Sequence, residues 1–238
     1  AGPELRWRSS SGQSLLRALL LPAVLGALTA AALWLAGLRH VLSLATIGLV
    51  AFVVGAILLD VHRGAALRAR AAPGRGYLSG LGGLLSRGRR RYGGLVVHLG
   101  MALMYLGFAG DAYKVEREVI MERGARRDVG GYTLRYDGAE RSMDAQKQMT
   151  TATLSVFRDG RHVGVVRPAH WVYFKQPDQP TSEVDIRRSV GEDLFVVLAA
   201  LDRTGRSATF KVVINPLVSW IWRGFLLLTL VTVGALLL

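Results

Sequence analysis

The sequence predicts a polytopic α-helical membrane protein with four transmembrane helices and an exported antiparallel β-rich domain between the third and fourth helices. One observation is composition, because 238 residues that are 51% hydrophobic and carry a net charge of +13 do not fit a single soluble domain. A second is that four apolar stretches approach the roughly 20 residues that a bilayer requires. These stretches are residues 15–38, 41–59, 93–110 and 217–238. A third is the change, after Tyr113, to short β-branched and aromatic runs typical of strands.

Residues 1–60 are expected to form a transmembrane helical hairpin, with a turn at residues 38–40. Pro22 lies inside the first span, where a membrane helix tolerates a kink because neighbouring groups satisfy the freed backbone atoms. The hairpin returns the chain to the side from which it entered.

Residues 61–92 are expected to form a basic cytoplasmic loop. They hold eight arginines and no acidic residue, and cytoplasmic loops carry the excess of arginine and lysine in membrane proteins. Leucines at helical spacing predict a short amphipathic helix on the inner membrane surface. They are Leu78, Leu81, Leu84 and Leu85. Because membrane topology explains the basic excess, no nucleic-acid partner is expected.

Residues 111–214 are expected to form the exported domain, an antiparallel sandwich or partly open barrel. The segment 111–215 is nearly neutral, with 17 basic and 15 acidic residues. Asp159-Gly160 is the clearest hairpin signature, since both residue types tolerate positive φ, and Arg203-Thr204-Gly205 predicts a second. The predicted strands are residues 115–121, 132–136, 150–157, 162–167, 171–174, 184–190, 194–201 and 208–214.

Residues 215–238 are expected to form the last transmembrane helix. Asn215-Pro216 would open it, since proline suits a first helical turn, and Trp220 and Trp222 would lie at the membrane interface. The chain has no cysteine, which excludes disulfides, thiol chemistry and a Cys-x-x-Cys-His haem attachment site of its own.

His98 is the most informative residue, because it is an ionisable side chain inside the third span, residues 93–110. Such a residue is costly in lipid unless it faces protein or a cofactor. The span holds no charged residue, so a partner outside its own helix is expected. Three roles remain open: a core histidine bonded to a neighbouring helix, an axial ligand of haem, and a proton relay.

The third span is predicted to have two occupied faces. Gly93, Gly100 and Gly107 recur every seven residues, a pattern that allows close helix packing. At 100° per residue, His98 lies almost opposite Gly100. The side of His98 is shared by Gly94, Met101, Ala102 and Tyr105.

Several stretches resemble the carboxyl-terminal part of the CcmF family, the large membrane subunits of bacterial cytochrome c haem lyases. They are RRYGGLVVHLG at 90–100, LGFAG at 106–110, PTSEVDIR at 180–187, EDLFVVL at 192–198 and NPLVSWIW at 215–222. The stretches occur in the family's order with appropriate spacing.

This resemblance implies part of a membrane haem lyase that attaches haem from CcmE covalently to apocytochrome c in the periplasm. It implies haem b in the membrane, with His98 as an axial ligand of the haem iron. Gly94, Met101 and Tyr105 would form the haem-side face of the helix. The implied partners are the amino-terminal half of CcmF, CcmH/CcmI, holo-CcmE, apocytochrome c and membrane lipid, in the bacterial inner membrane.

The family's Trp-rich haem-handling segment and its other haem-ligating histidines are not found in residues 1–238. The chain is therefore expected to be a truncated fragment or a natural split subunit that is inactive alone. No haem role is assigned to the remaining histidines, because none lies in a matching motif. They are His40, His62, His162 and His170.

Other functions remain open. The chain could be a non-catalytic assembly scaffold of the same pathway, in which His98 only packs. It could belong to NrfE, the related protein dedicated to nitrite reductase. A transporter with His98 as a proton relay is a third alternative, although the inverted-repeat helices and further intramembrane acids of transporters are not found in this sequence.

Overall fold

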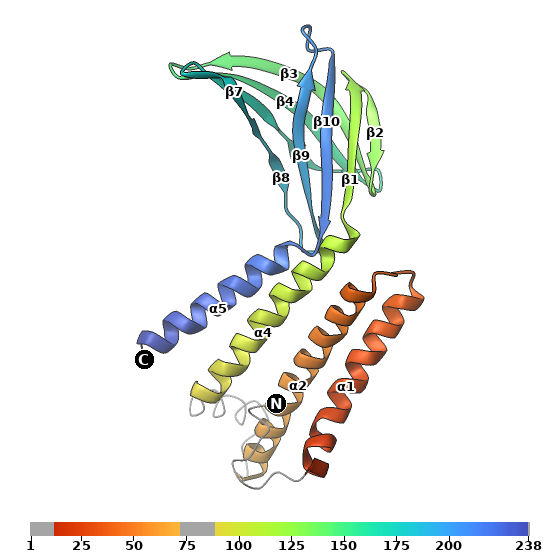
Figure 1. Ribbon diagram of the computed structural model, residues 1–238, viewed down its shortest axis with the longest axis vertical. Helices are drawn as coiled ribbons and strands as arrows, with labels where there is room; N and C mark the ends of the chain where they lie inside the picture. Colours follow the sequence, from red (N-terminus) through yellow and green to blue (C-terminus); the bar gives the residue numbers. More distant parts are fainter. Residues whose placement is uncertain (1–11, 72–88, 238) are drawn as a thin grey trace. The chain divides into compact units, whose positions relative to one another are not determined.

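The computed structural model describes residues 12–71 and 89–237, so the predicted amphipathic helix at residues 78–85 lies outside the described residues. The chain divides into two compact units (Figure 1). One unit contains the helices, and the other, Tyr113–Ser219, contains the strands. The helices are α1 (Gly12–Leu35), α2 (Val41–Ala71), α4 (Arg89–Gly110) and α5 (Ser219–Leu237).

Helices α1 and α2 form the predicted hairpin, and glycines bring them close together. A side-chain carbon on Gly26 would overlap the carbonyl oxygen of Gly48, and one on Gly55 would lie 2.8 Å from Leu25 Cδ2. Small residues allow membrane helices to approach backbone to backbone. Pro22 is accommodated inside α1, as predicted.

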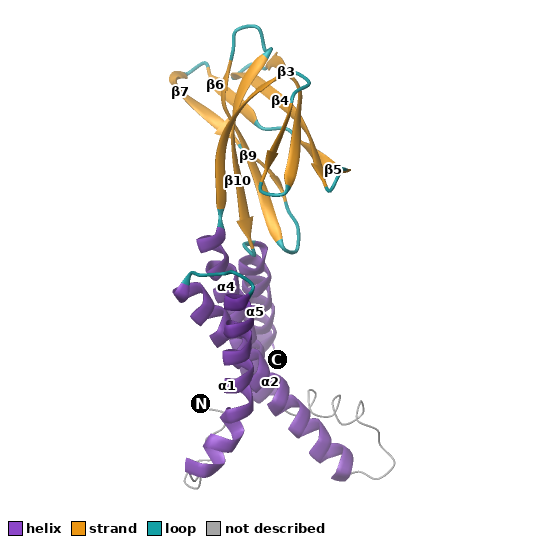
Figure 2. Ribbon diagram, turned by 90° about the vertical axis from the view of Figure 1, so that its right-hand side faces the viewer, coloured by secondary structure: helices purple, strands orange, loops and turns teal. Residues whose placement is uncertain are grey.

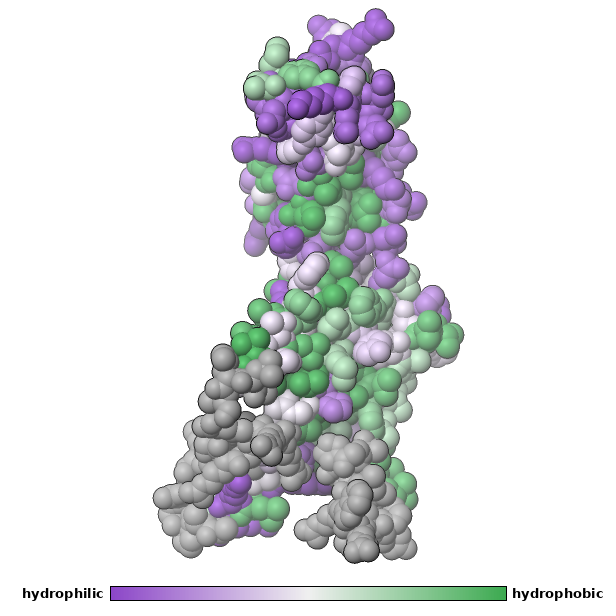
Figure 3. All heavy atoms as spheres, turned by 60° about the vertical axis from the view of Figure 1, so that its left-hand side comes forward, coloured by the Kyte–Doolittle hydropathy of each residue, from purple (hydrophilic) through white to green (hydrophobic). Residues whose placement is uncertain are grey.

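In the described part of the chain, three helices are long and apolar enough to cross a membrane: Ala18–Leu35, Val41–Arg70 and Tyr92–Tyr113. The fourth predicted span contains a shorter apolar helix, Ser219–Gly234. On the face drawn in Figure 3, hydrophobic residues cover much of the helical unit, whereas hydrophilic residues dominate the strand unit. The fold is that of a multi-pass membrane protein with a β-rich domain.

Helix α2 is longer than predicted. It runs past residue 59 to Ala71, so residues 61–71 of the expected loop are helical. Alanine and arginine are good helix formers, and Arg68 and Arg70 in the last turn interact favourably with the helix dipole. The helix therefore continues beyond its apolar stretch.

Helix α5 begins later than predicted. Asn215 and Pro216 are the last residues of a strand, in which Pro216 pairs with Glu192. Leu217 then adopts a φ of 62°, and its N–H donates to the carbonyl of Gly191. The positive φ changes the chain direction between strand and helix, so the proline does not lie in the first helical turn.

The strand unit is an antiparallel β-sandwich, as expected (Figure 2). Its four-stranded sheet has the order β1-β10-β9-β8, and its six-stranded sheet has the order β2-β3-β4-β6-β7, with β5 also paired to β4. The strands are β1 (Val115–Glu122), β2 (Arg126–Val129), β3 (Tyr132–Met143), β4 (Lys147–Arg158), β5 (Arg161–Val166), β6 (Ala169–Tyr173), β7 (Gln176–Glu183), β8 (Asp185–Arg187), β9 (Glu192–Leu201) and β10 (Ser207–Pro216).

Side chains from both sheets fill the space between them. Tyr136 from β3 and Phe210 from β10 are fully buried and meet edge to face, with ring centroids 5.3 Å apart. The Tyr136 hydroxyl donates to the carbonyl oxygen of Gly205 at 3.0 Å. Burial, assisted by the nearby Asp202 carboxylate, raises the pKa of Tyr136 above its usual value.

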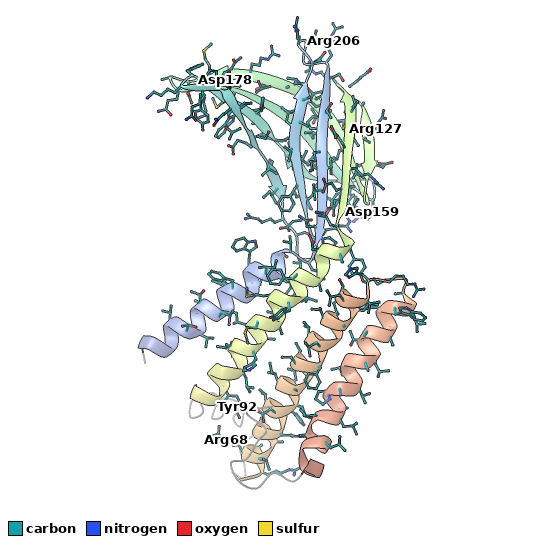
Figure 4. The ribbon with its side chains drawn as sticks, viewed as in Figure 1. Arg68, Tyr92, Arg127, Asp159, Asp178 and Arg206 are labelled. Atoms are coloured by element: carbon teal, nitrogen blue, oxygen red, sulfur yellow. The ribbon has the colours of Figure 1, made fainter. Side chains whose placement is uncertain are left out.

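The two predicted hairpins are confirmed. Asp159 and Gly160 have φ values of 50° and 74° in the turn between β4 and β5, and Gly205 has a φ of 70° between β9 and β10. Asp159 and Arg206 are labelled at opposite ends of the strand unit in Figure 4.

Two strands were missed, and one predicted strand is shorter than expected. β2 and β7 are polar and lie at the two edges of the six-stranded sheet. β7 contains two prolines, which edge strands tolerate. The run predicted at 184–190 forms only the three-residue β8. Alternating hydrophobicity is weak where little of a strand is buried.

Candidate functional site

His98 lies on α4 with its side chain exposed, and its ring is held by its own helix. Nδ1 of His98 is 2.7 Å from the carbonyl oxygen of Gly94, one turn earlier. One ring nitrogen is therefore satisfied within the helix, because an i−4 carbonyl is within its reach. The expected partner outside the helix remains a prediction for the other nitrogen.

This hydrogen bond fixes which nitrogen of His98 carries the proton. A carbonyl oxygen only accepts, so Nδ1 donates, and the neutral ring then keeps its lone pair on Nε2. Among the described residues, Nε2 has no hydrogen-bond partner. A histidine that donates one ring N–H to a carbonyl and keeps the other nitrogen available has the arrangement typical of a metal ligand.

The imidazole lines a pocket of about 380 Å³ between α2 and α4. Drug-sized and cofactor ligands are commonly bound in cavities of about 300–1,000 Å³ with few polar groups. The lining comprises Thr46, Leu49, Val50 and Val53 from α2, and His98, Met101, Ala102 and Tyr105 from α4. Leu49, Met101 and Tyr105 remain exposed, so the pocket is open at its rim.

Most of the residues predicted to share the face of His98 line the same pocket. Met101 and Tyr105 line the pocket beside His98, as does Ala102, while Gly94 contributes the carbonyl that orients the ring. Their roles toward haem stay predictions. The pocket residues of α2 were not predicted, because nothing in an apolar helix of this kind indicates which neighbour it will contact.

Packing on the two sides of α4 explains why His98 faces the pocket. Tyr92 and Leu95 pack on Ile57 and Val61 of α2, and Tyr92 is labelled at the start of α4 in Figure 4. On the other side of α4, a side chain on Gly100 would meet Gly224 and Leu228 of α5. The predicted division into a packed glycine face and an imidazole face is present.

The other described histidines have different surroundings. Nδ1 of His40 accepts from the N–H of Ser43 and lies 2.9 Å from its hydroxyl, at the beginning of α2. His162 stacks edge to face on Phe157, with ring centroids 5.3 Å apart. Among the described residues, no group of three or more His, Cys, Asp or Glu side chains could hold a metal ion. One histidine in an apolar pocket is a poor site for a bare metal ion, which requires several protein ligands.

The strand unit contains a polar network that the sequence did not indicate. Asp137 accepts from Arg135 Nε and from the hydroxyl of buried Ser155, both at 2.6 Å. Arg135 also contacts the ring of Phe157, 5.8 Å from its centroid. In the part of the chain that the structure describes, Ser155 bonds Asp137 and Arg135 and no histidine. The network therefore joins strands β3 and β4 and does not pair a nucleophile with a base.

Known proteins resemble this chain in sequence and in fold. Residues 112–216 match the family model described as the CcmF C-terminal beta-sandwich. The chain is 30% identical over 151 residues to the cytochrome c-type biogenesis protein CcmF of Pseudomonas aeruginosa, covering 63% of this chain and 23% of that protein. Cytochrome c-type biogenesis protein ccl1 of Rhodobacter capsulatus is 28% identical over 232 residues, covering 95% of this chain and 33% of that protein.

The chain is similar to CcmF proteins. A solved structure, Cytochrome c Heme Lyase CcmF, has the same fold, with a TM-score of 0.73 and 24% identity over 98% of this chain and 36% of that one. The chain spans about a quarter to a third of the length of these relatives. The predicted resemblance to the carboxyl-terminal part of the family is confirmed.

Proposed function

We propose that this chain is the carboxyl-terminal region of a membrane haem lyase for cytochrome c maturation, and that His98 is an axial ligand of a b-type haem. The relatives are named as cytochrome c-type biogenesis proteins, and the matching solved structure as a haem lyase. One observation supports the ligand role most directly: the bond from Nδ1 to Gly94 leaves Nε2 of His98 available inside an apolar pocket.

The residues present fit such a group. His98 would supply the axial nitrogen, Gly94 would hold the ring in the correct tautomer, and the apolar side chains of α2 and α4 would exclude water. A b-type haem supplies a one-electron redox centre when bound. The second axial ligand would come from the part of the lyase that these residues do not include.

The strand unit has a different proposed role. We assign it to the periplasm, where it would bind CcmH/CcmI, holo-CcmE or apocytochrome c. It would not itself catalyse the formation of covalent bonds. Nearly balanced charge supports docking rather than electrostatic capture of one strongly charged ligand. Arginine enrichment between the second and third spans supports this orientation.

Optical spectroscopy tests the ligand role. In membranes that contain the chain with the rest of its lyase, the wild type should show the reduced α band of a six-coordinate b-type haem. His98→Ala should remove or strongly weaken this band, and added imidazole should restore part of it. His162→Ala is the matched control, because it removes an exposed imidazole from the strand unit.

A non-catalytic scaffold is the second candidate, since the intrahelical bond already satisfies one nitrogen of His98. In that case His98→Ala would leave the spectrum unchanged and lower only the yield of assembled complex. An unchanged α band in a correctly assembled His98→Ala complex would therefore overturn the ligand assignment and favour the scaffold.

A further inference from the structure

The pocket between α2 and α4 has three polar side chains among its lining residues: Thr46, His98 and Tyr105. The Thr46 hydroxyl donates to the carbonyl oxygen of Leu42 at 2.8 Å. His98 donates from Nδ1 to Gly94. Two polar groups of the pocket have no hydrogen-bond partner among the described residues: Nε2 of His98 and the hydroxyl of Tyr105.

The Tyr105 hydroxyl has no hydrogen-bond partner among the described residues. Its side chain is 59% exposed and rests edge to face against Phe108, with ring centroids 6.4 Å apart. A phenol hydroxyl can donate one hydrogen bond, so this group is available to a ligand that carries an acceptor and occupies the pocket.

Tyr105 lies inside the apolar span rather than at its end. The span runs from Tyr92 to Tyr113. Tyr105 precedes Tyr113 by five residues of α-helix and three of 3-10 helix, about 13 Å at rises of about 1.5 and 2.0 Å per residue. His98 is seven residues from Tyr105, about 10 Å along the same helix face. One ligand that meets both groups must be flat or elongated, apolar in its body and polar at an edge.

We propose that the Tyr105 hydroxyl binds a propionate carboxylate of the haem that His98 ligates, which makes Tyr105 a positioning residue of that site. This inference rests on the proposed haem function of the pocket. A carboxylate is the strongest acceptor for a phenol, and hydrogen bonds to charged groups in apolar surroundings are stronger than neutral ones. The contact would fix the rotation of the porphyrin about the His98 bond.

Haem and its dimethyl ester distinguish this contact, because the ester lacks the carboxylate charge but keeps the porphyrin and iron. The lyase complex is stripped of haem in detergent and titrated with each compound, following the low-spin absorbance. The wild type should bind haem about tenfold more tightly than the ester, as expected for one charged hydrogen bond. Tyr105→Phe should bind both equally and keep the low-spin spectrum.

Tyr92→Phe is the matched control, since it removes a phenol hydroxyl from the same helix but outside the pocket lining. It should keep the wild-type preference for haem over the ester. An unchanged preference in Tyr105→Phe would overturn the inference. If His98→Ala still removed the haem band in that case, the proposed haem function of the pocket would stand without a role for Tyr105. Absence of a His98-dependent band in the wild type would overturn both proposals.

Discussion

Gly100 of α4 and Gly224 of α5 meet backbone to backbone. A side-chain carbon on Gly224 would overlap the carbonyl oxygen of Gly100 and lie 2.9 Å from the backbone nitrogen of Met104. Neither obstacle can rotate away, unlike the end of a side chain. This contact holds the glycine face of α4 against α5 and so leaves the opposite face, with His98, to the pocket.

Gly224→Ala should therefore destabilise the helical unit, by about 1–3 kcal/mol as found for overpacked contacts. Gly234→Ala is the control on the same helix, since nothing lies within 4 Å of its added carbon. Thermal unfolding in detergent measures both. Equal midpoints for the two variants would mean that α4 and α5 are not in this contact.

Leu49→Trp should reduce haem content while His98 is unchanged. Leu49 lines the pocket with 61% of its surface exposed, so the larger indole would occupy ligand space without overpacking the core. Leu58→Trp is the control, on the same helix, 63% exposed and outside the lining. The haem-to-protein absorbance ratio of purified complexes checks the prediction. A ratio equally low in both variants would argue against the pocket as the haem site.

Gly130→Ala should destabilise the strand unit more than Gly131→Ala. Both glycines have positive φ, 54° and 87°, which costs a residue with a side chain about 1 kcal/mol or more. A carbon on Gly130 would also overlap Cδ1 of buried Ile214, whereas nothing lies within 4 Å of Gly131. In an Ile214→Val background, which lacks Cδ1, the two alanine variants should become similar in unfolding midpoint. A persistent difference would place the cause elsewhere.

Stability of the strand unit should fall as pH rises above about 10. Burial raises the pKa of Tyr136 above the usual tyrosine value of about 10, so the unfolded chain loses this proton at a lower pH than the folded one. The stabilisation is complete below the unfolded pKa and is lost as pH rises through the folded pKa. Tyr136→Phe should lower stability at pH 7 by about 1 kcal/mol through the lost bond to Gly205 and make the alkaline decline less steep. Unfolding midpoints at several pH values, followed by fluorescence, test this; identical alkaline slopes would contradict it.

Single cysteines can test the proposed orientation, because the chain has none of its own. Arg206→Cys places a thiol on the exposed β9–β10 hairpin, and Ser86→Cys places one in the arginine-rich segment between the second and third spans. A membrane-impermeant maleimide should label the first variant in intact spheroplasts and the second only after lysis. The reverse pattern would invert the topology.

The sequence predicted local structure wherever one residue pattern had a single physical solution. Long apolar runs can satisfy their backbone in lipid only as helices, and Asp159-Gly160 suits a two-residue hairpin with positive φ. Prediction failed where the pattern was weak. The polar edge strand β7 shows little alternation of hydrophobic and polar residues. Helix α2 continues past residue 59 because the residues that follow its apolar stretch are also good helix formers.

For the candidate site, too, some features followed from the sequence and others only from the tertiary structure. The sequence by itself determined that His98 is an imidazole in an apolar span with Met101 and Tyr105 on its face, because helical periodicity fixes neighbours along one helix. Only the tertiary structure decided that α2 forms the other wall of the pocket and that Gly94 holds the ring. Contacts between helices depend on how the side chains of two segments far apart in the sequence fit together. Which ring nitrogen of His98 donates to Gly94 depends on the exact position of the backbone. The residue pattern of a single helix contains neither kind of information.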